Sequence, residues 1–167
     1  HMKNLEIYIH IPFCVRKCEY CDFLSFPADD DAKLRYVKGL MAEMIFYGPL
    51  MKNYQVSSVY IGGGTPSSID EQWIAALMEG VFDCFNVLPD AEISIECNPG
   101  TLSREKLLAY RDAGINRLSI GLQSANNDEL KLLGRIHTFE QFVTNYEVAR
   151  NVGFKNINVD LMYGLPG

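Results

Sequence analysis

Three cysteines near the start of the chain have a type and spacing suited to metal chemistry. Cys14, Cys18 and Cys21 follow the pattern Cys-x3-Cys-x2-Cys, and an apolar, β-branched run precedes them at 5–11. That run predicts a strand ended by Pro12, so the cysteines lie on the loop that leaves the strand, where their sulfurs can converge on one centre. An iron–sulfur cubane used only for electron transfer takes four cysteines. Three cysteines would leave one iron with an open position for another ligand.

Other uses of these cysteines remain open. One is zinc, whose fourth ligand would be His10, Cys84 or Cys97. Structural zinc sites usually combine two separated Cys/His pairs, and the sequence shows no such pairs. A thioredoxin-type use of Cys18 and Cys21 would leave Cys14 without a role. A disulfide framework is disfavoured because the chain has an odd number of cysteines, 5 in all.

The remainder of the chain alternates between strand and helix patterns. Strands are expected at 5–11, 56–61, 93–96, 117–122 and 157–161. The helices between them are expected to start at 29–31, at a capping box of Ser68 and Glu71, at Ser103, at Asn126, and at a capping box of Thr138 and Gln141. The first helix should bury a stripe that includes Met44 and Ile45 and should end at Gly48. This alternation predicts an α/β fold with a parallel sheet.

The polar residues that stand out follow the ends of the expected strands. The cysteine loop follows the first strand, the glycines 62–64 follow the second, and Glu96, Gln123 and Asp160 lie at or near the ends of the next three. Parallel α/β sheets place their sites at the carboxyl ends of strands. The sequence therefore predicts one functional cluster at this edge of the sheet.

Length, charge and hydropathy limit the class of protein. A chain of 167 residues fits one domain, expected at 3–167, with His1 and Met2 resembling a cloning remnant. The net charge of −6 and the lack of a basic stripe argue against nucleic acid as the main partner. No apolar run approaches membrane-spanning length, and no targeting segment is evident. We expect a cytoplasmic protein with reduced thiols.

The cysteine pattern, with Tyr20 just before the last cysteine, is similar to that of the radical S-adenosylmethionine (SAM) superfamily. The longer string YIHIPFC…CEYCDF resembles the oxygen-independent coproporphyrinogen III oxidases and the heme chaperones of the HemW type, and the resemblance runs from Tyr8 to the last residue. It implies a partial TIM-like (β/α)6 barrel, of which this chain holds about five βα units. It also implies a [4Fe-4S] cluster whose open iron chelates SAM and whose electron cleaves it.

The resemblance assigns roles to twelve residues. Cys14, Cys18 and Cys21 would hold the cluster, and Gly63, Gly64 and Thr65 would contact the methionine end of SAM. Arg135 would pair with the SAM carboxylate, Glu96 with the ammonium or a ribose hydroxyl, and Gln123 and Asp160 with the ribose, while Tyr8 and Tyr20 would flank SAM. Taken singly, the glycines could form a tight turn, Arg135 could be a solvated helix-end arginine, and either tyrosine could belong to the core.

One departure from the oxidase pattern favours the HemW-type branch. The oxidases carry a further cysteine just after the third one, whereas here Cys21 is followed by Asp-Phe-Leu-Ser at 22–25. The expected partners are a porphyrinogen or heme and an electron donor such as flavodoxin or ferredoxin. A true coproporphyrinogen III decarboxylase and a zinc-stabilised binding module are the alternatives.

Overall fold

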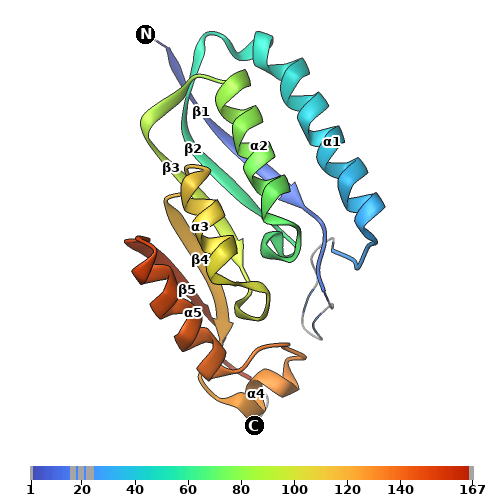
Figure 1. Cartoon of the computed structure of the whole chain (residues 1–167), viewed down its shortest axis with the longest axis vertical. Coiled ribbons are helices and arrows are strands. Elements are labelled where there is room, and N and C mark those ends of the chain that lie inside the picture. Colours follow the sequence, from blue (N-terminus) through green and yellow to red (C-terminus); the bar gives the residue numbers. More distant parts are fainter. Residues whose placement is uncertain (1, 16–17, 19–20, 22–24, 166–167) are drawn as a thin grey trace.

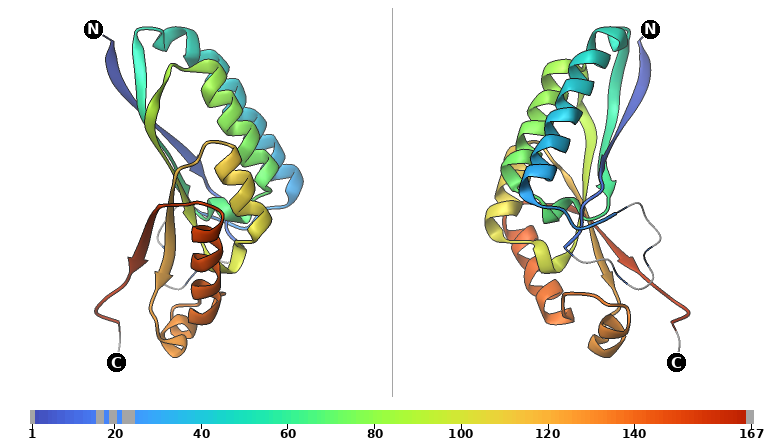
Figure 2. Two further views of the ribbon diagram at one scale, coloured as in Figure 1. Left: turned by 60° about the vertical axis from the view of Figure 1, so that its left-hand side comes forward. Right: turned by 90° about the vertical axis from the view of Figure 1, so that its right-hand side faces the viewer.

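The chain forms a parallel sheet with its helices packed on one face (Figure 1, Figure 2). The computed structural model describes residues 2–15, 18, 21 and 25–165. Its strands are β1 (Lys3–Ile11), β2 (Tyr54–Gly63), β3 (Val87–Cys97), β4 (Arg117–Gln123) and β5 (Asn156–Leu161). Its α-helices are α1 (Asp30–Tyr47), α2 (Glu71–Cys84), α3 (Arg104–Asp112), α4 (Asn127–Leu132) and α5 (Phe139–Asn151). Short 3-10 helices are η1 (Gly48–Met51), η2 (Pro66–Ser68) and η3 (Pro99–Thr101).

The strand order is that of an opened barrel. The five strands are all parallel and lie side by side in the order β1-β2-β3-β4-β5. Each crossover therefore moves to the next strand in the same direction, which keeps the helices on one face of the sheet (Figure 2). A doubly wound sheet reverses direction and has helices on both faces. The prediction of a TIM-like α/β fold cut to about five units is confirmed.

The two faces of the sheet differ because side chains alternate along each strand. Ile61, Ile95 and Ile120 point toward the helices and are fully buried. The residues one position away point to the opposite face and are polar, among them Tyr60, Glu96 and Ser119. A core on one face and polar groups on the other leave the second face free to bind a ligand.

The helices cover the apolar face with a matching stripe. In α2 the residues that share one face, Ile74, Leu77, Met78 and Val81, each have 0% exposure. The caps at Ser103 and Thr138 are as predicted, and Thr138 and Gln141 form both bonds of a capping box. No helix in the described part of the chain is long and apolar enough to cross a membrane.

Three local predictions are wrong. Asp70, and not Ser68, caps α2, because Ser68 lies in η2 while the Asp70 side chain accepts from the Gln72 amide at 2.8 Å. Ile45 is 67% exposed, because the buried side of α1 is the face that carries Val37 and Met44. The third strand was expected at 93–96, but β3 begins at Val87, and its pairing with β2 breaks between Val87 and Glu92.

Candidate functional site

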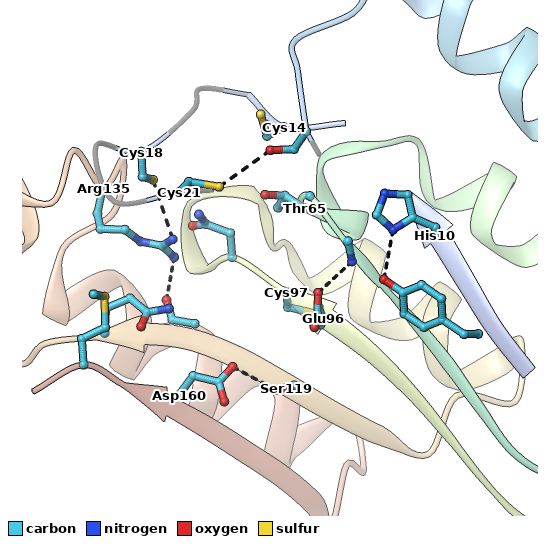
Figure 3. A pocket seen from close by; sticks show the side chains of 18 residues that line it. His10, Cys14, Cys18, Cys21, Thr65, Glu96, Cys97, Ser119, Arg135 and Asp160 are labelled. Carbon is cyan, nitrogen blue, oxygen red and sulfur yellow. Dashed lines mark hydrogen bonds between the residues drawn. The ribbon is translucent and has the colours of Figure 1, made fainter. Parts of the chain in front are cut away.

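The carboxyl ends of the strands surround one cavity of about 730 Å³ (Figure 3). It lies on the polar face, next to the loop that carries the cysteines. Of the twelve residues predicted for the site, all except Tyr20 line this cavity: Tyr8, Cys14, Cys18, Cys21, Gly63, Gly64, Thr65, Glu96, Gln123, Arg135 and Asp160. Tyr20 lies outside the described residues. The strand-end argument from the sequence thus locates the cavity.

The cysteines of the motif are free thiols on one side of the cavity. Cys18 Sγ donates to the Gly134 carbonyl oxygen at 3.7 Å, and Cys21 Sγ lies 3.8 Å from Ser25 Oγ. Within residues 2–15, 18, 21 and 25–165, no three His, Cys, Asp or Glu side chains are gathered closely enough to hold a metal ion. In a four-iron cluster each thiolate binds a different iron. Three thiols on one cavity wall fit that donor set.

The alternative fourth ligands lie in different places. His10 and Cys97 line the cavity. Cys84 does not: it packs against Gly48, at the end of α1 away from the cysteine loop. Burial raises the pKa of the Cys97 thiol far above its ordinary value, so this thiol stays protonated.

The glycine segment is shaped by close neighbours on three sides. A Cβ at Gly62 would lie 3.1 Å from the Glu96 carboxyl, and one at Gly64 would lie 2.6 Å from the Phe13 carbonyl oxygen. Gly63 has φ +121°, which strains any residue with a Cβ. The Gly64 amide donates to the Ile11 carbonyl oxygen at 2.8 Å, so the segment is fixed against the strand that leads to the cysteines.

Glu96 is a half-buried carboxylate held at both oxygens. It accepts from the Tyr60 hydroxyl at 2.9 Å and from the Gly63 amide at 3.1 Å. Burial raises the pKa of Glu96, the two hydrogen bonds oppose the rise, and the charge of Asp160 adds to it. Burial and the neighbouring Glu96 also raise the pKa of Tyr60 to about 12, so the phenol remains a donor. An oriented carboxylate of this kind suits a cationic or hydroxyl-bearing ligand.

Arg135 and Gln123 converge above Gly121. A Cβ at Gly121 would lie 2.9 Å from Gln123 Nε2 and 3.2 Å from Arg135 Nη2. Arg135 Nη2 donates to the Gly121 carbonyl oxygen at 2.7 Å, and Nη1 lies 3.9 Å from Cys18 Sγ (Figure 3). The guanidinium therefore lies between the end of β4 and the cysteine loop, and the reading of Arg135 as a solvated surface residue is wrong.

Asp160, which was predicted, forms a polar row with Ser119 and Asn158, which the sequence analysis did not identify. Its carboxylate accepts from the Ser119 hydroxyl at 3.1 Å and from Asn158 Nδ2 at 2.7 Å. Ser119 and Asn158 are paired across β4 and β5. Asn158 lies two positions before Asp160 and Ser119 four positions before Gln123, so the two-residue period of a strand was the signal that could have found them.

Tyr8 and His10 form the wall contributed by β1. The Tyr8 hydroxyl lies 3.0 Å from His10 Nδ1, and the Tyr8 ring stacks on Tyr60 with centroids 6.3 Å apart. Tyr8 is 58% exposed, so it is not a core tyrosine. It presents its ring to the cavity.

Comparison with known proteins identifies the family. The family model of the radical SAM superfamily matches residues 8–167. The chain belongs to the radical SAM superfamily. It is 40% identical over 161 residues to a heme chaperone HemW of Bacillus subtilis and 40% identical over 168 residues to that of Escherichia coli. These matches cover 96% and 97% of the chain but 42% and 43% of the relatives, so the chain spans about two-fifths of their length.

A solved structure supports the same placement. Coproporphyrinogen III oxidase (HemN) from Escherichia coli, described as a radical SAM enzyme, superposes with a TM-score of 0.90 at 34% identity. The match covers 99% of this chain and 38% of that one. Membership of the superfamily implies SAM and an iron–sulfur cluster, which is consistent with the three thiols and the polar cavity.

Proposed function

We propose that the chain is the cofactor-binding part of a HemW-like protein of heme metabolism, which holds a [4Fe-4S] cluster and SAM. Cys14, Cys18 and Cys21 would bind the cluster. When bound, the cluster supplies the electron that cleaves SAM. The other residues of the cavity bind and orient SAM and exclude water from it.

The observation that carries the proposal is that all described members of the predicted set line one cavity. These residues lie on five strands and the segments that follow them, and together they bring a guanidinium, two carboxylates, the three thiols of the motif and a glycine segment to one cavity. SAM offers a carboxylate for Arg135, an ammonium for Glu96, and ribose hydroxyls for Asp160 and Gln123. Each polar end of the ligand then has a partner of opposite charge or hydrogen-bonding sense.

The HemW-type branch is favoured over the oxidase by two observations. Cys21 is followed by Asp-Phe-Leu-Ser at 22–25, whereas the oxidases are expected to carry a further cysteine just after the third one. Curated relatives named heme chaperone HemW are 36–40% identical to the chain over nearly its whole length. The partner of the whole protein would then be heme rather than a porphyrinogen substrate, with flavodoxin or ferredoxin as the electron donor and the cytoplasm as its location.

The test uses the full-length protein with its cluster reconstituted under anaerobic conditions. Hemin is titrated while the Soret band is followed, and coproporphyrinogen III with SAM and a reductant is incubated separately and assayed for loss of propionate carboxyl groups. We expect stoichiometric heme binding and no decarboxylation. Decarboxylation without heme binding would assign the protein to the oxidases, and a colourless zinc-containing protein would assign it to zinc-stabilised modules.

A further inference from the structure

The end of β4 contains a strained turn directly in the cavity wall. Gln123 has φ 71°, the only positive value among the described residues other than glycine. The Ser124 amide donates to the Leu122 carbonyl oxygen at 3.0 Å across it. A hydrogen bond from residue i+2 to residue i around a left-handed centre is a γ-turn of the rare, strained kind. Strain of this sort persists only where the surroundings enforce it.

Pairing with β5 alone does not hold the strained turn at Gln123 in place. Pairing between β4 and β5 shifts at this point: Gly121 is paired with Asp160 and Gln123 with Leu161, which leaves Leu122 out of register. The Gln123 carbonyl oxygen accepts from the Met162 amide at 2.9 Å. The Leu122 carbonyl oxygen has a different second partner, His137 Nε2, at 3.2 Å.

His137 is built to donate this one bond. Its side chain is only 3% exposed, and its Nδ1 has no hydrogen-bond partner among the residues that the structure describes. Burial and the charge of Arg135 lower the pKa of His137 to about 4, so the ring is neutral and carries a single N–H. Because a carbonyl oxygen can only accept, that N–H must be on Nε2, which faces the Leu122 carbonyl oxygen. Burying a ring with an unpaired nitrogen is unfavourable. A leucine would fill the same space without that cost, so the donated bond is what the histidine adds.

His137 lies in a segment that is fixed at one end by helix α5 and at the other by the end of β4. It directly precedes Thr138, whose side chain caps α5 in a complete capping box. Two residues earlier, Arg135 donates to the Gly121 carbonyl oxygen. The segment 135–137 therefore holds two successive carbonyl groups at the end of β4, and α5 holds the segment.

We propose that His137 is a positioning residue that maintains the γ-turn at Gln123 and so presents Gln123 and Arg135 to SAM. The part that concerns SAM rests on the function proposed above. The part that concerns the turn does not.

The test compares His137→Phe, which removes the donor at similar size, with His137→Gln, whose side-chain amide can donate to the same carbonyl. In the reconstituted full-length protein, SAM affinity measured by calorimetry should fall about tenfold in His137→Phe, the effect of one lost hydrogen bond. It should stay within about threefold of wild type in His137→Gln. Val152→Ala, in a buried position at the other end of α5, is the matched control: it should lower stability and leave SAM affinity unchanged.

A second measurement needs no SAM. Hydrogen exchange of the Ser124 amide, followed in a peptide spanning 122–126, should be about tenfold faster in His137→Phe than in wild type. In the double variant His137→Phe with Gln123→Gly, protection should return, because glycine adopts the left-handed conformation without strain.

Unchanged exchange in His137→Phe would overturn the inference whatever the SAM result. An equal loss of SAM affinity in His137→Gln and His137→Phe would also overturn it. If the wild type itself failed to bind SAM, the proposed function would be wrong, and the exchange experiment would still decide whether His137 holds the turn.

Discussion

At the residue scale, Glu96 is a half-buried carboxylate with two hydrogen bonds, and its effect on the stability of the fold can be tested through pH. Burial raises the pKa of Glu96 in the folded state above its value in the unfolded chain, so folding favours the protonated carboxyl group. The contribution of this group to the stability of the fold is therefore complete below the unfolded-state pKa. It is lost as the pH rises through the folded-state pKa. Glu96→Gln should therefore make the SAM-free protein more stable than wild type at pH 7–8, with the gain shrinking toward pH 4. Urea unfolding at both pH values measures this. A variant less stable at every pH would mean that the bonds from Tyr60 and Gly63 outweigh the burial.

Arg135 is the residue on which SAM affinity should depend most. Arg135→Ala should weaken binding by about 1.5–3 kcal/mol, the range for hydrogen bonds to charged groups. Iron content should remain near that of the wild type, because the guanidinium contacts Cys18 Sγ without being a cluster ligand. Calorimetry with reconstituted protein measures the affinity. Arg111→Ala is the control, since Arg111 pairs with Asp112 at the surface; equal affinities in the two variants would remove Arg135 from the site.

At the scale of the element, the end of β2 needs a glycine, whereas the middle of α1 does not. Gly63→Ala should destabilise the protein by roughly 2 kcal/mol or more, because its φ is +121° and the new Cβ would lie 2.7 Å from the His10 ring. Gly39→Ala is the matched control: it lies inside α1 with nothing within 4 Å, so it should stabilise by about 0.5–1 kcal/mol. Thermal unfolding of both variants is the measurement. If Gly63→Ala left the stability unchanged, the end of β2 would be able to shift to accommodate the new Cβ.

The elements and the main site residues could be predicted from the sequence because both depend on local patterns. Strand and helix periods locate the carboxyl ends of the strands, and the predicted residues lie at those ends. The period of a strand could place Ser119 and Asn158 on the polar face, but their pairing depends on the register between β4 and β5, and the role of His137 depends on one strained turn. Neither register nor φ is encoded in a short stretch of sequence.

At the scale of the whole molecule, the sheet has a strand edge at β5 with no strand beyond it among the described residues. An edge of this kind has unpaired N–H and C=O groups that can pair with another chain. We predict that the isolated 167-residue chain self-associates. Sedimentation velocity over a range of concentrations should show a rising weight-average mass. Leu161→Lys should shift the chain toward monomer, because Leu161 is 67% exposed and charged edge residues oppose pairing.

A monomer at every concentration would contradict that prediction. It would mean that the β5 edge is covered from within the chain. The polar face of the sheet, with its cavity, would then be more enclosed than the strand order indicates.

The cluster is the centre of the account, and iron content tests it most directly. After anaerobic reconstitution, iron and acid-labile sulfide are measured in wild type and in five single cysteine-to-alanine variants. We predict about four irons per chain in wild type, Cys84→Ala and Cys97→Ala, and loss of the cluster in Cys14→Ala, Cys18→Ala and Cys21→Ala. Iron lost as completely in Cys84→Ala as in Cys18→Ala, or one zinc per chain in place of iron, would contradict the assignment.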